Sequence, residues 1–449
     1  MVDVKISIIG AGSAVFSICL IKDLCLTPSL SGSTVSLMDV NEERLNAVYA
    51  ICRKYAEETG SRLRIEKTLN RRESLREADF VVNTALTAGY SRLREGWSIA
   101  RRWGYRFGGS LHIMHDEAFW INFYQLRFFD SLMEDILEEC PEAWHIQLAN
   151  PVLAGVTYLG RKHSRVKTIG LCHGFSGVYR IASLLGLDAE NICFETPGVN
   201  HFIWLTSLTY EGKDVLPLLD EWIAREAGKH FEKVGFSSDM GPKAFDLYRR
   251  FRVFPVGDTC TPGGGSWPWW YHTDSETERR WREDPESWWE GFLTYNRETV
   301  EKIIRASFDN SRKITSIFPA EKSGEIIIPL IESIACDIPR VFQVNIINSE
   351  GFVPGVPTDF EVEVKAEVSG RGVRGIRSGG LPKPLVAYIL RDRVAPIEVE
   401  LEAYESGNRE RLLELVEMDP WTMSEEQARG LLNDILSIPY HEEMRRHYK

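Results

Sequence analysis

Two short segments of the sequence contain residues that bind transition metals. They are Cys172-His173-Gly174 and, further along the chain, Val199-Asn200-His201. One thiolate and one imidazole, from Cys172 and His201, are suitable ligands for a divalent transition metal. No CxxC pair occurs, and two protein ligands leave positions open, which is typical of a catalytic rather than a structural site. Cys172 alone would be typical of a small buried hydrophobe; the two histidines favour the metal site.

A strand followed by a glycine-rich turn opens the chain. The apolar run Lys5–Ile9 predicts a strand buried on both faces, and Gly10-Ala11-Gly12-Ser13 follows it directly. A helix starting there would direct its amides and the positive end of its dipole at a pyrophosphate. The third glycine of the usual fingerprint is absent, so the motif alone also fits a tight turn without a ligand.

Further strand ends supply the other candidate cofactor-binding residues. The predicted strand Thr34–Met38 ends at Asp39, where a ribose diol needs an acidic acceptor. An acidic residue there favours NAD over its phosphorylated form, because it would repel the added phosphate. Residues 79–83 predict another strand, which leads into Thr84 at the ligand-binding edge of the sheet. The cofactor-binding residues predicted from these strand ends are therefore Gly10, Gly12, Ser13, Asp39 and Thr84, to which the resemblance described below adds Asn150.

The remaining pattern predicts an α/β protein with two lobes. The first, residues 1–195, is expected to be a Rossmann fold with helices at 41–55, 74–78 and 119–139 and strands at 145–148 and 166–171. The second, residues 196–449, is expected to be an α+β domain. Its predicted strands lie at 202–210, 326–334, 342–347 and 360–368, and its predicted helices at 216–227, 395–417 and 424–436.

Length and composition restrict the class of protein. A chain of 449 residues exceeds one ordinary hydrophobic core. The net charge of -12 disfavours a nucleic-acid partner, and eight irregularly spaced cysteines indicate a reducing, cytoplasmic compartment. The apolar run at residues 6–21 is too short to span a membrane and contains two glycines, so it predicts strand, turn and helix rather than a signal peptide. No membrane association is expected.

Several of these motifs together resemble a known enzyme family. Residues 79–85 and Ala149-Asn150-Pro151-Val152 resemble segments of lactate and malate dehydrogenases. The glycine turn, Ala149-Asn150-Pro151, Cys172-His173-Gly174-Phe175 and Val199-Asn200-His201 together resemble the NAD- and divalent-metal-dependent glycosidases of glycoside hydrolase family 4. The resemblance implies that Cys172 and His201 bind a metal, usually manganese. The Cys-His-Gly sequence is similar to that of the α-glucuronidases.

The resemblance also implies a mechanism outside the usual two-carboxylate scheme for glycosidases. In that family, bound NAD takes hydride from carbon 3 of the sugar, and the resulting ketone acidifies the proton on carbon 2. A base removes that proton, the glycosidic oxygen leaves carbon 1, water adds and the hydride returns. Here His173 is the implied acid and Asp258 the implied base, with Tyr248 or Tyr271 as the alternative base.

Other residues have expected roles that follow from the same resemblance. Asn150 is expected to contact the nicotinamide and substrate hydroxyls, and Asn200 to support His201 or a sugar hydroxyl. A uronide carboxylate would need a cation, and the sequence does not choose among Arg92, Arg94, Arg106 and Arg180. Trp267, Trp269 and Trp270 could stack on sugars or belong to a core or an interface.

The expected activity is that of an α-glucuronidase acting on a small α-linked uronide or glycoside, in a homodimer or homotetramer. The alternatives are an α-galacturonidase or α-glucosidase of the same family, or an NAD-dependent sugar or hydroxy-acid dehydrogenase. The dehydrogenase has no reason to retain Cys172 together with His201.

Overall fold

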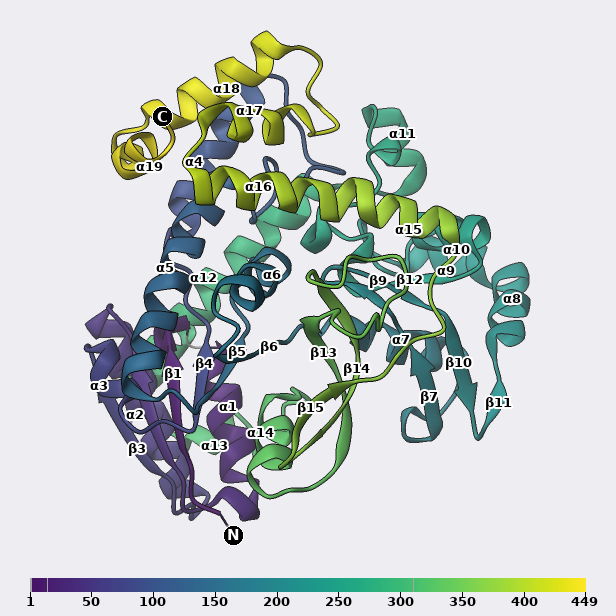
Figure 1. Cartoon of the computed structure of the whole chain (residues 1–449). Helices are drawn as coiled ribbons and strands as arrows, with labels where there is room; N and C mark the ends of the chain where they lie inside the picture. The colour runs from purple at the N-terminus through teal and green to yellow at the C-terminus, as the bar shows by residue number, and fades with distance from the viewer. Residues whose placement is uncertain (1, 14, 310) are drawn as a thin grey trace.

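A parallel sheet forms the first half of the protein. The computed structural model describes residues 2–13, 15–309 and 311–449. Its first six strands are arranged in the order β3-β2-β1-β4-β5-β6, all parallel (Figure 1). This is the strand order of a Rossmann fold, which confirms the predicted class. The strands are β1 (Lys5–Ile9), β2 (Thr34–Met38), β3 (Arg64–Thr68), β4 (Phe80–Asn83), β5 (Trp144–Gln147) and β6 (Lys167–Gly170).

Helices cover both faces of this sheet because the strands are apolar on both sides. One face packs against α1 (Val15–Cys25) and α2 (Glu42–Glu58), and the hydrophobic cluster on that face also includes α12 (Pro285–Phe308), α13 (Ile314–Ile317) and α14 (Ile327–Ala335). The other packs against α3 (Arg71–Leu75), α4 (Gly89–Arg102), α5 (Phe119–Glu139) and α6 (Val152–Lys162). Asn41 caps α2 by accepting a hydrogen bond from the Arg44 amide, as predicted.

The sheet continues into the second half of the chain through antiparallel strands. Asn345 of β13 pairs with Gly170 of β6, and the order then runs β13-β14-β8-β9-β12, with β15 beside β14. Helices α12 and α13 pack against α2, and α14 packs against α1, so elements of both halves share one hydrophobic cluster and the division at residue 195 stays a prediction. These strands are β8 (Gly198–Val199), β9 (Phe202–Leu205), β12 (Phe254–Val256), β13 (Arg340–Ile347), β14 (Glu361–Ser369) and β15 (Gly372–Gly375).

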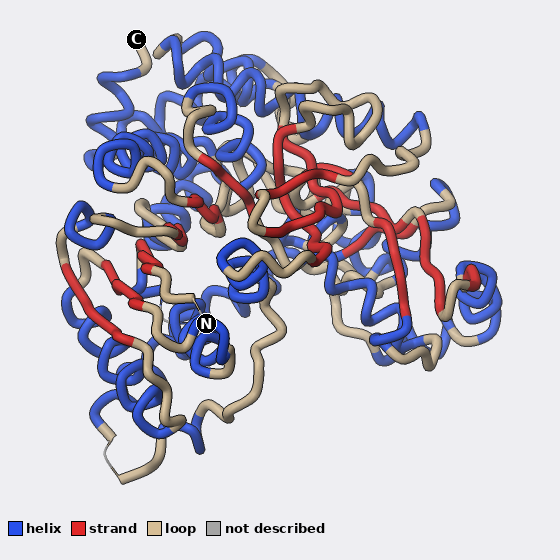
Figure 2. Tube along the Cα trace, turned by 60° about the horizontal axis from the view of Figure 1, so that its bottom comes forward, coloured by secondary structure: helices blue, strands red, loops and turns tan. Residues whose placement is uncertain are grey.

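The rest of the second half confirms the predicted α+β character. A small separate sheet contains β7 (Ile192–Glu195), β10 (Ser207–Tyr210) and β11 (Lys213–Asp214). Figure 2 shows the strands flanked by helices in both halves. The helices around this part are α7 (Gly177–Leu184), α8 (Leu216–Arg225), α9 (Ala227–Lys233), α10 (Pro242–Phe251) and α11 (Ser275–Trp281).

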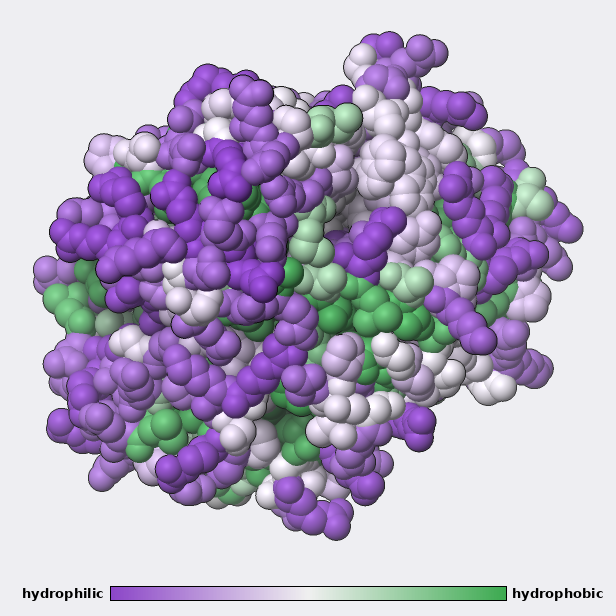
Figure 3. Space-filling model, turned by 45° about the horizontal axis from the view of Figure 1, so that its top comes forward, coloured by the Kyte–Doolittle hydropathy of each residue, from purple (hydrophilic) through white to green (hydrophobic). Residues whose placement is uncertain are grey.

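Helices close the chain and reach back over the first half (Figure 1). They are α15 (Lys383–Ile389), α16 (Ala395–Ser406), α17 (Arg409–Glu417), α18 (Glu425–Ser437) and α19 (Glu442–His447). Hydrophilic side chains cover most of the face drawn in Figure 3, around a central apolar band. None of the helices within the described residues is long and apolar enough to cross a bilayer.

The structure corrects three predicted elements. The short helix at 74–78 lies instead at Arg71–Leu75, because Asn70 caps it and the Ser74 hydroxyl is buried against Ser7. Residues 326–334 form α14 and not a strand; a short apolar run cannot separate the two, and Pro329 suits a first helical turn. The helix predicted at 395–417 is interrupted at Gly407, which has left-handed backbone angles and ends α16.

Candidate functional site

The glycine turn, Asp39 and Thr84 meet at the carboxyl end of β1, β2 and β4. Gly10 has φ of +86° and lies so close to Ala85 that a Cβ would be 2.6 Å from the Ala85 Cα atom, which requires glycine. The Gly12 amide donates to Asp39 at 2.7 Å. Thr84 Oγ1 donates to the Gly10 carbonyl at 3.0 Å, and Ser13 donates to Thr84 at 3.3 Å. Five of the six predicted cofactor-binding residues therefore lie together, and the sixth is Asn150.

This arrangement fits a dinucleotide. A helix begins immediately after the turn, and the acidic side chain at the end of the second strand is adjacent to the turn. The other carboxylate oxygen of Asp39 accepts from the Asn41 amide at 2.8 Å, which fixes the orientation of the carboxylate. Each carboxylate oxygen can accept more than one hydrogen bond, so a ribose diol can still donate to Asp39.

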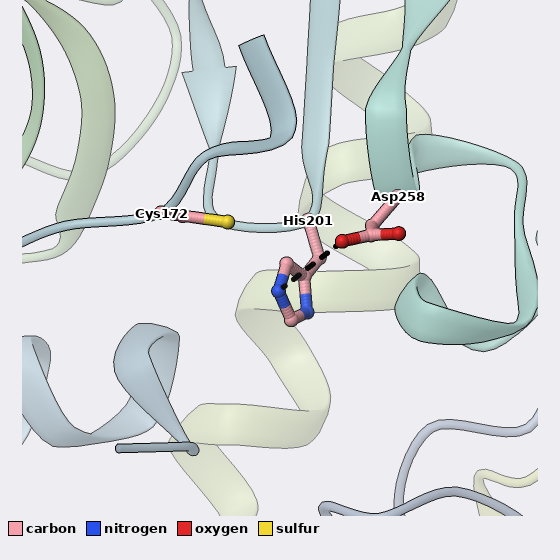
Figure 4. Close-up of side chains that lie close together, drawn as sticks. All are labelled: Cys172, His201 and Asp258. Carbon is pink, nitrogen blue, oxygen red and sulfur yellow. Dashed lines mark ion pairs between the residues drawn. The ribbon is translucent and has the colours of Figure 1, made fainter. Parts of the chain in front are cut away.

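Cys172, His201 and Asp258 converge from three separate segments. Cys172 follows β6, His201 lies between β8 and β9, and Asp258 follows β12. One donor atom from each lies within 4.8 Å of the others, and Figure 4 shows Cys172 and Asp258 on opposite sides of the His201 ring. The His201 Nε2 to Asp258 Oδ2 distance is 4.0 Å. A thiol, an imidazole and a carboxylate at these separations fit a divalent transition metal.

The backbone and electrostatics of His201 are unusual. Its φ of +57° is rare for a residue other than glycine, and such strain is commonly found at functional sites. Burial alone lowers the pKa of His201, but Cys172, Glu117 and Asp258 outweigh it and raise that pKa well above the ordinary value. Burial raises the pKa of the Cys172 thiol, although His201 opposes this. A metal ion binding here would displace both protons.

Buried carboxylates that the sequence analysis did not identify surround His201. Glu117 Oε1 lies 3.5 Å from His201 Nδ1. Asn200 is buried, and its backbone amide donates to Glu361 at 3.1 Å while its side chain donates to Glu363 at 3.4 Å. Asn200 therefore links the turn that carries His201 to β14, and its support of the histidine or of a sugar hydroxyl stays a prediction. The alternation of glutamate and valine at residues 361–364 could have indicated Glu361 and Glu363, because it places both carboxylates on one face of a strand.

Asn150 lies beside a second group of acidic and imidazole side chains. His115, Asp116 and Glu117 each place a donor atom within 4.8 Å of the other two. The Asn150 side-chain amide donates to Asp116 at 3.3 Å, and the Asn150 backbone carbonyl accepts from the Gln125 side chain at 2.8 Å. Because Glu117 also contacts His201, this segment connects the predicted nicotinamide and substrate residue Asn150 with the metal-binding group.

The predicted acid and the alternative bases have partners outside the group of Cys172, His201 and Asp258. The His173 side chain is 65% exposed, and its Nδ1 atom lies 3.8 Å from Glu325 Oε1. Tyr271 is buried and donates to Asp246 at 2.5 Å. Burial, together with the charge and hydrogen bonding of Asp220, raises the pKa of Tyr248 to about 12. Of the candidate bases, the structure brings Asp258 to the metal-binding group.

The tryptophans and most of the candidate arginines have other partners. Trp267 is buried against Phe202, with ring centroids 4.8 Å apart, whereas Trp269 is partly exposed. Core packing thus accounts for Trp267. Arg92 lies over the Tyr440 ring, Arg94 pairs with Glu290 and Arg106 donates to the Thr273 carbonyl. Arg180 pairs with Asp239 at 2.6 Å, close to the segment that carries Asp258.

Replacing Glu363 with glutamine should change how stability depends on pH. Burial raises the pKa of the Glu363 carboxyl to about 8, whereas an unfolded glutamate ionises near pH ~4.3. Between these values the unfolded state loses a proton that the folded state keeps, so the wild type loses up to about 1.4 kcal/mol per pH unit as pH rises. Glutamine cannot ionise. We expect Glu363→Gln to gain stability relative to the wild type between pH ~5 and ~8, measured by urea denaturation without added metal. Parallel pH profiles of the two proteins would contradict this.

The chain belongs to glycosyl hydrolase family 4. Residues 5–187 match the family 4 glycosyl hydrolase model, and residues 196–422 match the C-terminal domain of family 4 glycosyl hydrolases. The protein is therefore a glycoside hydrolase, as the resemblance predicted.

Relatives and solved structures cover almost the whole chain. It is 24% identical to an alpha-galactosidase of Bacillus subtilis (strain 168), over 96% of each chain. It is also 24% identical to an alpha-galacturonidase of Lachnoclostridium phytofermentans (strain ATCC 700394 / DSM 18823 / ISDg), over 97% of this chain and 95% of the relative. The fold is similar to that of a 6-phospho-alpha-glucosidase from gut microorganisms in complex with NAD and Mn2+, with a TM-score of 0.78, 17% identity, and coverage of 98% of this chain and 99% of the other.

Proposed function

We propose that this protein is an NAD- and divalent-metal-dependent α-glycosidase that hydrolyses α-linked uronides, with α-glucuronides preferred. The observation that carries the proposal is that Cys172, His201 and Asp258 converge in a chain whose glycine turn and Asp39 suit a dinucleotide. The Cys-His-Gly sequence supports α-glucuronides as the preferred substrates, because it is similar to that of the α-glucuronidases. The alpha-galacturonidase and alpha-galactosidase relatives make galacturonides the next candidate class, followed by neutral α-glycosides.

When bound, NAD would supply a hydride acceptor, and manganese or a similar ion would supply a Lewis acid. Asp39 would accept hydrogen bonds from the ribose, and the glycine turn would lie against the pyrophosphate. Cys172 and His201 would hold the metal, with Glu117 fixing the orientation of the imidazole through Nδ1. Asn150 would orient a sugar hydroxyl beside the nicotinamide.

Asp258 would remove the proton from carbon 2 of the sugar. Its Oδ1 atom accepts from the Thr261 hydroxyl at 2.7 Å, which orients the carboxylate and leaves Oδ2 on the His201 side. His173 would protonate the leaving oxygen, and its 65% exposure allows the side chain to turn toward a bound substrate. We further propose a cytoplasmic homodimer or homotetramer; the eight cysteines are all free thiols, which suits a reducing compartment.

Replacing Asp258 with asparagine should abolish most activity without comparable loss of metal binding. We expect kcat to fall by about 10²–10⁴-fold because the general base is lost. Exchange of the carbon 2 proton with deuterated water should slow by a similar factor, followed by proton magnetic resonance. Mn2+ affinity, measured by isothermal titration, separates a base from a ligand: an equally large loss of affinity would assign Asp258 to the metal instead.

Substrate class is tested with aryl α-glucuronide, α-galacturonide, α-glucoside and α-galactoside, each assayed with NAD, Mn2+ and a reductant. Turnover of a uronide without accumulation of NADH would support the proposal. Stoichiometric accumulation of NADH would instead indicate a dehydrogenase. Turnover of only the neutral sugars would overturn the assignment of uronides as substrates, but the assignment of the protein to glycosyl hydrolase family 4 would stand.

A further inference from the structure

Arg180 lies just beyond the Cys-His-Gly segment, and Asp239 holds it. Arg180 is part of α7, and one of its guanidinium nitrogens lies 2.6 Å from Asp239 Oδ1. The Asp239 side chain is 6% exposed, whereas that of Arg180 is 63% exposed. The anchoring carboxylate is thus buried, while most of the arginine fork remains open to a ligand.

The first turn of α7 packs directly on the backbone that carries Asp258. A Cβ atom at Gly177 would lie 3.0 Å from the Gly257 amide nitrogen and 3.3 Å from Asp239 Oδ2. Gly257 immediately precedes Asp258, and Arg180 is one helical turn after Gly177, on the same side of the helix. Arg180 therefore lies at the rim of the site beside Asp258.

The carboxylates around the site favour a cationic side chain that can bind an anionic substrate, in addition to the metal ion. Asp116, Glu117 and Asp258 are all carboxyl side chains of the metal-binding region, and a uronide would add another negative charge. Arg393, although close to Glu117, is buried and donates to the Gly264 carbonyl. Arg92, Arg94 and Arg106 have the partners described above. Arg180 is the candidate arginine that combines exposure with proximity to Asp258.

We propose that Arg180, oriented by Asp239, binds the carboxylate of the uronide substrate and determines the preference for uronides over neutral glycosides. This inference rests on the proposed function. Arginine suits the role because its planar fork donates two parallel hydrogen bonds to a carboxylate, and the contact with Asp239 fixes its direction.

The experiment compares Arg180→Met, Arg180→Lys and the wild type on an aryl α-glucuronide and its methyl ester, which differ in the charge that Arg180 would recognise. We expect Arg180→Met to lower kcat/KM for the acid by about 10–100-fold, mainly through KM, because it loses a charge-assisted hydrogen bond. The ester should lose much less, and Arg180→Lys should lie between. The inhibition constant of free glucuronate should rise by a similar factor.

Controls and opposite outcomes separate the two proposals. Arg225→Met is a matched control, because Arg225 is an exposed helical arginine on α8 that pairs with Glu221. Asp239→Asn should weaken recognition of the acid less than Arg180→Met does. If Arg180→Met lowered kcat/KM equally for the acid and the ester, or for neither, the proposed role of Arg180 would be wrong. The proposal that the protein hydrolyses uronides would still stand. A wild type that fails on both α-glucuronide and α-galacturonide would overturn the proposed function and this inference together.

Discussion

Cys172→Ser is expected to lower both Mn2+ affinity and turnover severely. Among the residues that the structure describes, the Cys172 thiolate is one of three donor side chains that lie within 4.8 Å of one another, and serine cannot supply a comparable anionic ligand at neutral pH. Removing a residue that hydrogen-bonds to a metal ligand lowers metal affinity by about 10–100-fold. Removing the ligand itself should therefore lower Mn2+ affinity by more than about 100-fold. Without the Lewis acid, kcat/KM should fall by at least about 100-fold.

Isothermal titration with Mn2+ and steady-state kinetics on the best substrate of the panel measure the two effects. Cys193→Ser is the matched control, because Cys193 is a free, exposed cysteine on β7. His201→Gln should behave like Cys172→Ser. If Cys172→Ser bound Mn2+ as tightly as the wild type, the assignment of Cys172 to the metal would be wrong.

Lys243→Met is expected to cause a large loss of stability, because it removes one partner of a buried ion pair. Lys243 Nζ lies 2.8 Å from Glu283 Oε2, and the two side chains are 0% and 1% exposed. The methionine leaves Glu283 buried without its cation, which typically costs about 3–5 kcal/mol of the free energy of unfolding. Urea denaturation followed by tryptophan fluorescence measures the change.

Two further variants identify the cause of that loss. Lys243→Met combined with Glu283→Leu removes both charges, and we expect it to recover much of the lost stability. Lys229→Met is a control, because Lys229 is exposed and its ion pair with Glu226 should contribute no more than about 1 kcal/mol. A double variant as unstable as the single one would show that packing, and not the unpaired charge, is responsible.

The sequence predicted correctly those elements of the fold for which the hydrophobic pattern and the turn residues indicate the same structure. Strands β1 and β2 are apolar runs that end in a glycine turn and in Asp39. The hydrophobic pattern and the residues after each strand therefore predicted the elements around the candidate dinucleotide site. Residues 326–334 were assigned wrongly because α14 is buried on several sides, and no alternation distinguished it from a strand.

The candidate site was predicted less completely than the fold. Cys172 and His201 were identified by residue type and by resemblance to a family, yet Glu117, Glu361 and Glu363 gave no comparable motif. Their place beside His201 depends on a loop with Glu117 and on strand β14, both far from His201 in the sequence, which residue spacing does not report. Lys243 was missed for a related reason, since a lysine is almost never fully buried unless tertiary contacts pair it.

One continuous sheet carries both the turn with Gly10 and the strand that ends before Cys172. β1 and β6 are separated in that sheet by β4 and β5, so three strand spacings, about 14 Å in all, set their distance. The sheet fixes the distance between the candidate dinucleotide site and the candidate metal site, because a hinge between them would have to break the hydrogen bonds between these strands. Changes in specificity can then arise in the surrounding loops and helices, such as α7, without altering that span.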